Sequence, residues 1–167
     1  MMLITKNNSE DKLNINTACL PSCPEQFSQI FPNKTGSNCW MSGWRVRRDT
    51  NTFSPRQHKE MLTLVDQDQC HQTLASSLAA RDPHLAQAFS LDQSEICAGV
   101  GEGEGAGQDV CQADGGAPLV CRAQSGRWTV VGLLTWSLGC QAGPQSQHNP
   151  GVFLSIAHVM DWVISVH

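Results

Sequence analysis

Short apolar or alternating runs dominate the chain, and turns rich in Gly, Pro, Asn and Ser separate them. Runs of this length between turn residues are typical of β-strands. The strands that we predict cover residues 1–4, 39–44, 60–65, 118–121, 128–134 and 151–155. The stretch QSGRW (124–128) predicts a hairpin turn between two of them. Many short strands predict an all-β fold class, as a small barrel or sandwich.

Two stretches have the pattern of helices instead. Residues 67–80 are rich in Ala and Leu and end before Asp82-Pro83, where a proline would interrupt a helix. Residues 155–167 carry apolar side chains at helical spacing. We therefore expect this C-terminal segment to be a helix that packs on the strands through one apolar face.

Length, charge and cysteine content limit the class of protein. The 167 residues suffice for one domain with its own core, and a net charge of −4 leaves no basic footprint for nucleic acid. No apolar run is long enough to span a membrane. Eight cysteines and two N-x-S/T glycosylation sequons, at Asn7 and Asn33, are typical of an extracellular glycoprotein. The first residues do not form a signal peptide, so we expect the secretion signal to lie outside this chain.

Six motifs together indicate a family. They are NINTACLPSC, NCWMSGW, SEICAG, GQDVCQADGGAPLVC, LLTWSLGC and NPGVFLSIAHVMDWV, in this order along nearly the whole chain. The set resembles the second half of the protease domain of trypsin-like serine proteases. The resemblance implies the second six-stranded barrel of that fold plus a C-terminal α-helix, with the first barrel absent from this chain.

The same resemblance divides the chain into two parts. Residues 1–23 would be the last strand of the missing first barrel and the inter-barrel linker, and residues 24–167 the C-terminal barrel with its helix. We expect residues 1–23 to pack poorly. We also expect an exposed apolar face, including Trp136 and Leu138, where the first barrel would dock.

The resemblance implies that the catalytic groups of the family are missing. Gly115 occupies the position of the nucleophilic serine, and glycine has no side-chain oxygen to attack a carbonyl. Ala113 replaces a glycine of the oxyanion hole, where a Cβ disfavours the required backbone geometry. Asp114 matches the aspartate that pairs with the N-terminal amine released by zymogen cleavage, an amine that would belong to the missing half. None of the histidines has the Ala-Ala-His-Cys context of the catalytic base; they are His58, His71, His84, His148, His158 and His167.

The residues of the family's specificity pocket are better preserved. Asp109 matches the aspartate that gives trypsin-like enzymes their preference for Arg or Lys. Ser137 and Gly151 match the pocket walls, and Thr135 and Trp136 belong to the same substrate-binding strand. Serine is larger than the usual glycine at position 137, so it would narrow the entrance. In the alternative interpretation, Asp109 is a loop carboxylate in a pocket that binds nothing.

The cysteine pairing also follows from the resemblance, which implies the disulfides Cys39–Cys121, Cys70–Cys97 and Cys111–Cys140. Cys19 matches a cysteine that ties the protease domain to an upstream segment in many relatives, whereas Cys23 has no counterpart. The two either pair with each other or leave Cys19 free. A zinc site is a further alternative, but no second ligand pair stands at suitable spacing. We predict no metal and no cofactor.

Within the family, the glycine at position 115 and the acidic, glycine-rich stretch before it resemble most the clip-domain serine protease homologues of arthropods, of the masquerade-like and prophenoloxidase-activating-factor type. This implies an inactive, secreted cofactor in an extracellular cascade of innate immunity, of the melanisation type. Its partner would be a protein, either a component of the protease cascade or a prophenoloxidase-like target. Two alternatives stay open: a trypsin-like serine endopeptidase, and a truncated fragment without function.

Overall fold

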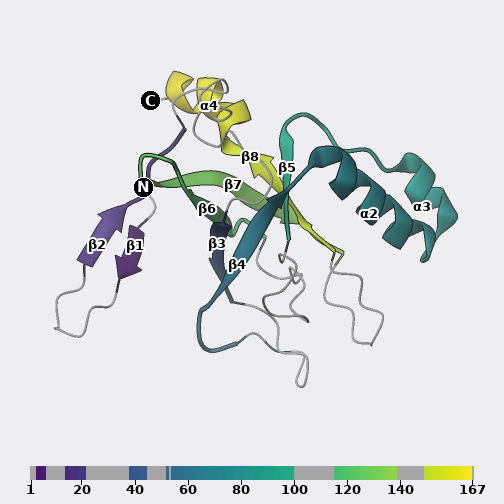
Figure 1. The fold of residues 1–167 in the computed structure, drawn as a ribbon, viewed down its shortest axis with the longest axis horizontal. Helices are drawn as coiled ribbons and strands as arrows, with labels where there is room; N and C mark the ends of the chain where they lie inside the picture. Colours follow the sequence, from purple (N-terminus) through teal and green to yellow (C-terminus); the bar gives the residue numbers. More distant parts are fainter. Residues whose placement is uncertain are drawn as a thin grey trace.

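The chain folds around a closed antiparallel barrel of six strands (Figure 1), in the order β3-β4-β5-β8-β7-β6. A computed structural model describes residues 3–6, 14–21, 38–44, 52, 54–99, 115–138 and 149–166. The strands are β3 (Asn38–Gly43), β4 (His58–Val65), β5 (Glu95–Gly99), β6 (Pro118–Arg122), β7 (Trp128–Trp136) and β8 (Gly151–Ser155). The barrel and the C-terminal helix confirm the predicted fold class.

The barrel interior is filled by apolar side chains from every strand. Phe153, Leu62 and Leu119 are fully buried there, as expected from the alternation along each strand. The packing leaves no room for a side chain at Gly132 of β7. A Cβ at this position would lie 2.9 Å from the Cβ of Phe153 and 3.2 Å from the Cδ1 of Ile96. A side chain at position 132 would therefore force Phe153 or Ile96 to shift, and glycine avoids this.

A hairpin and a disulfide join the strands that close the barrel. β6 and β7 are connected by the predicted turn, in which Gly126 has φ +81° and donates its N–H to Ala123 O at 2.8 Å. β3 and β6 are the neighbouring strands whose pairing closes the barrel. In this pairing Cys39 stands opposite Cys121, and their sulfurs form a disulfide.

Of the other predicted cysteine pairs, Cys70–Cys97 is also present and ties α2 to β5. Cys19 is a free thiol. The third predicted disulfide, Cys111–Cys140, and the unassigned Cys23 lie outside the described residues.

Two helices lie together at one side of the barrel (Figure 1), α2 (Gln67–Ala79) and α3 (Pro83–Ala88). α2 matches the predicted helix and is N-capped by Asp66, whose carboxylate accepts from the N–H groups of Asp68 and Gln69. The helix α3 was not predicted from the sequence. Asp82-Pro83 indicated only the end of a helix, but an Asp N-cap followed by Pro also begins one.

The C-terminal helix α4 (Ile156–Ser165) packs on the outside of the barrel. Ile156 and Met160 are buried against Val120 and Val130 of β6 and β7, which confirms the predicted apolar face. Within the described ranges, no helix is both long and apolar enough to cross a membrane.

The N-terminal part of the chain differs from the expectation. β1 (Leu3–Lys6) and β2 (Asn14–Thr17) pair only with each other in the sheet topology, as a two-stranded sheet. The linker after β2 does not pack poorly, however. Cys19 donates its N–H to Trp128 O and accepts from Val130 N, both at 2.9 Å, and Pro21 is fully buried.

The linker binds there because β8 pairs with β7 only from Gly132 onward. The first residues of β7 therefore leave one edge open, and the linker satisfies its backbone groups. The expectation of poor packing for residues 1–23 is wrong for this part of the linker.

The close approach at Gly132 leads to a first prediction. We expect Gly132→Ala to lower the free energy of unfolding by about 1–3 kcal/mol, because the added methyl group overpacks the core against Phe153 and Ile96. Urea-induced unfolding, followed by circular dichroism, measures this difference. Gly115→Ala is the matched control, since a Cβ there meets no described atom within 4 Å. Equal stabilities of the two variants would contradict this account of the core.

Candidate functional site

The turn that carries Gly115 is held against β7 by its backbone. The next residue, Gly116, has φ +82° and donates its N–H to Leu134 O at 2.8 Å, while Leu134 donates its own N–H to Ala117 O at 2.9 Å. Gly115 itself is exposed. No described heavy atom lies within 4 Å of an ideal Cβ at position 115.

Several predicted site residues fall outside the described part of the chain. These are the pocket aspartate, the oxyanion-hole position, the activation aspartate and both sequons: Asp109, Ala113, Asp114, Asn7 and Asn33. Their assigned roles therefore stay predictions.

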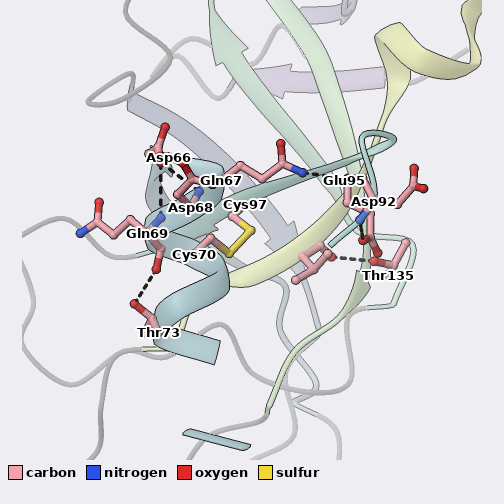
Figure 2. The surroundings of a disulfide bond; sticks show 11 residues. Asp66, Gln67, Asp68, Gln69, Cys70, Thr73, Asp92, Glu95, Cys97 and Thr135 are labelled. Carbon is pink, nitrogen blue, oxygen red and sulfur yellow. Dashed lines mark hydrogen bonds between the residues drawn. A yellow bond between two sulfur atoms is a disulfide. The ribbon is translucent and has the colours of Figure 1, made fainter. Parts of the chain in front are cut away.

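The two residues that the resemblance assigned to pocket walls lie at the ends of adjacent strands: Ser137 directly follows β7, and Gly151 begins β8. The register of β7 and β8 shifts between Leu134 and Trp136, so Thr135 falls at an irregularity. Its Oγ1 donates to Val152 O at 2.8 Å (Figure 2), which ties the side chain of this residue to β8. Trp136 stands opposite Val152. Continuing that antiparallel register brings Ser137 level with Gly151.

The apolar residues beside Ser137 are not free. Trp136 and Leu138 are half-buried and pack against a second core cluster around Cys70, Leu74 and Cys97. The expectation that both would lie on an exposed apolar face is wrong, because α2 and its disulfide to β5 cover them. The described large apolar side chains that are exposed are Leu20, Trp44, Leu85, Trp128, Trp162, Ile164 and Val166.

The Cys70–Cys97 disulfide is surrounded by polar side chains that organise the local backbone (Figure 2). Gln67 of α2 donates its Nε2 to Asp92 O at 3.0 Å. The pKa of Asp92 is lowered, mainly because its Oδ1 accepts the backbone N–H of Ser94 at 2.7 Å. The Gln67 hydrogen bond and the disulfide therefore both connect α2 with the segment that enters β5.

His58 is engaged away from the Gly115 turn. Its Nε2 lies 2.8 Å from the Oγ of Ser54, which also lies 2.8 Å from Arg56 O and accepts from Arg56 N at 3.2 Å. A hydroxyl has one hydrogen to donate. If it goes to Arg56 O, His58 must be the donor to Ser54. Ser54 is also buried, so this pair holds a loop and is not an exposed nucleophile with its base.

The other histidines are distributed over the helices and the undescribed part of the chain. His71 of α2 stacks on Phe89 with 5.1 Å between ring centroids. His84 and His158 are exposed on α3 and α4, and His148 and His167 lie outside the described residues. No described histidine atom lies within 4 Å of an ideal Cβ at position 115.

One set of residues near Trp136 was not predicted from the sequence. Phe89 lies edge-on to Trp136, with 5.6 Å between ring centroids, and the Nη2 of Arg81 donates to Leu138 O at 3.1 Å. Both residues come from the stretch between Cys70 and Cys97. The pattern of apolar and polar residues in that stretch did not indicate which strand it would contact.

Comparison with known proteins agrees with this fold. The family model described as Trypsin matches residues 1–163. The chain is 35% identical over 152 residues to "Inactive CLIP domain-containing serine protease A3" of Aedes aegypti, which covers 90% of this chain and 27% of that protein. It is 29% identical over 153 residues to "Transmembrane protease serine 9" of Rattus norvegicus, with 91% and 12% covered. The chain thus spans about a quarter or less of the length of these relatives.

The glycine at position 115 leads to a second prediction. We expect that neither Gly115→Ser nor the double variant Ala113→Gly/Gly115→Ser hydrolyses an arginyl ester faster than the unsubstituted chain. A serine hydroxyl without a base is a poor nucleophile at neutral pH, and no described heavy atom lies within 4 Å of a Cβ at this position. Initial rates at equal concentrations of the three proteins measure this. Serine-dependent hydrolysis would mean that one of the six histidines acts as the base.

Proposed function

The chain belongs to the trypsin family, and from that premise we propose that it is a catalytically inactive, secreted member that acts by binding a protein partner. The observation that carries the proposal is the exposed Gly115 turn. A glycine at the position of the family's nucleophile has no oxygen for acyl transfer. The turn nevertheless keeps its anchoring to β7 through Gly116 and Leu134. The scaffold is kept while the attacking group is missing, which favours binding over catalysis.

The likeness to clip-domain homologues supports an extracellular role. One relative is 35% identical over 90% of this chain, and its name describes it as inactive and as containing a CLIP domain. We infer that this chain acts as a cofactor in an extracellular proteolytic cascade of innate immunity, of the melanisation type. The partner would be a protease of that cascade or a prophenoloxidase-like protein. The disulfides Cys39–Cys121 and Cys70–Cys97 support secretion, since disulfides persist in oxidising compartments.

We further propose that the partner inserts an Arg or Lys side chain between Ser137 and Gly151, with Asp109 at the floor of the pocket. A carboxylate there would form a charge-assisted hydrogen bond with the cationic group. Thr135 and Trp136 would line the approach, and their attachment to β8 supports this role.

Other parts of the chain have roles that stay proposals. Asp114 would have lost the N-terminal amine that it binds in active relatives, and Asn7 and Asn33 would carry glycans. Residues 1–23 would belong to a first barrel and its linker, and residues 24–167 to the second barrel.

The main competing hypothesis is that the chain is part of an active serine endopeptidase. The name of the second relative, a transmembrane serine protease, would agree with it. The two hypotheses differ in whether the protein has an activated serine. A truncated fragment without function is the third hypothesis, and it predicts neither activity nor binding.

Labelling with a fluorophosphonate separates the first two hypotheses, because this probe reacts only with an activated serine. We expect no labelling of the unsubstituted chain under conditions in which trypsin is labelled completely. Labelling at any serine of the native chain, lost on heat denaturation, would favour the endopeptidase.

A second experiment separates the cofactor from the fragment. We expect the chain, after fluorophosphonate treatment and removal of the excess reagent, to change the rate of arginyl ester hydrolysis by the endogenous proteases of cell-free mosquito haemolymph. Asp109→Asn is the matched variant, because it removes the proposed pocket charge while keeping the shape of the side chain. No effect of the unsubstituted chain on that rate would contradict the cofactor role.

A further inference from the structure

Side chains from one segment hold the strand ends on both sides of the proposed pocket. On one side, the Oγ of Ser77 in α2 donates to the Oδ1 of Asn149 at 2.7 Å, and both residues are buried. Asn149 stands two residues before Gly151, at the entry to β8. On the other side, Arg81 donates to Leu138 O at 3.1 Å, directly after Ser137.

Phe89 adds a third contact from the same segment. Its ring meets Trp136 edge-on at an interplanar angle of 87°, and it is stacked on His71 of α2 at 17°. Aromatic pairs in these two geometries are favourable beyond the area that they bury. Trp136 directly precedes Ser137, so both neighbours of Ser137 are held from the side of α2 and α3.

Ser137 itself does not determine its position by hydrogen bonding. Its Oγ is buried and has no hydrogen-bond partner among the described residues. The placement of this residue therefore depends on the groups that hold Trp136 and Leu138. α2 is a firm support for those groups, because Leu74 is fully buried and Cys70 is bonded to Cys97 of β5.

We propose that Ser77, Arg81 and Phe89, together called the α2 clamp, are positioning residues that set the spacing of Ser137 and Gly151. The α2 clamp thereby controls how well the pocket accepts a cationic side chain. This inference rests on the proposed function, because it concerns the same pocket. Buried hydrogen bonds such as that between Ser77 and Asn149 are costly to break when one partner stays buried, so the spacing is expected to be stiff.

The first test measures binding of p-aminobenzamidine, an aromatic amidinium that resembles an arginine side chain, by fluorescence titration. We expect Ser77→Ala and Arg81→Ala to raise the dissociation constant by roughly fivefold or more, given the usual contribution of a hydrogen bond. Ser77→Thr and Arg81→Lys, which keep a donor, are expected to restore most of the affinity. Thr73→Ala is the control on the same helix, because its hydroxyl donates only within α2, to Gln69 O.

The second test measures amide hydrogen exchange and does not depend on any ligand. We expect Ser77→Ala to speed exchange at residues 151–152, and Arg81→Ala at residues 136–138, by roughly fivefold or more. Exchange in β3 and β4 and the thermal midpoint are expected to change little in Arg81→Ala, since Arg81 is exposed.

The two tests distinguish failure of the clamp from failure of the pocket. If the unsubstituted chain does not bind p-aminobenzamidine, the proposed pocket is wrong, and the exchange rates alone decide the role of the clamp. Unchanged exchange at both strand ends in the Ser77 and Arg81 variants would overturn the inference. An equal effect of Thr73→Ala would also overturn it, since the changes would then reflect general loosening of α2.

Discussion

The pairing of β3 with β6 closes the barrel, and the rest of the structure depends on it. The two strands carry Cys39 and Cys121, which are separated by 82 positions in the sequence and joined by a disulfide between directly opposed residues. Closure leaves no open sheet edge along most of the barrel. It also places the interior side chains of all six strands around Phe153, which is accommodated by the absence of a Cβ at Gly132.

Closure also positions the candidate site. The Gly115 turn leads into β6, Ser137 follows β7, and Gly151 begins β8, and these three strands are neighbours in the barrel. A rigid barrel with a turn and two strand ends at one site is well suited to presenting a binding surface. Glycine at position 115 has no side-chain oxygen for acyl transfer, which supports the proposal that this surface serves in binding.

Two contacts that the sequence did not predict join segments far apart in the chain. The linker at Cys19 hydrogen-bonds with β7, and Phe89 contacts Trp136. No local pattern of residues predicts either contact. The helix α3 was missed for a different reason, because Asp82-Pro83 serves both as the end of one helix and as the start of the next. The disulfide pairs were predicted from resemblance to a family, since eight cysteines do not specify their own pairing.

The sequence pattern by itself determined five of the six barrel strands, the hairpin at Gly126 and the helices α2 and α4; it did not predict β5. The strands and helices follow from the periodicity of apolar residues and the hairpin from turn residues. The assignment of Gly115 to the nucleophile position came only from the resemblance to a family. Only the tertiary structure decided that Trp136 and Leu138 are covered and that α2 and the residue Arg81 after it reach the two strand ends of the site. The contacts that do this, from Ser77 to Asn149 and from Arg81 to Leu138, span 72 and 57 positions. Contacts of that separation depend on how the whole barrel closes, which no local pattern records.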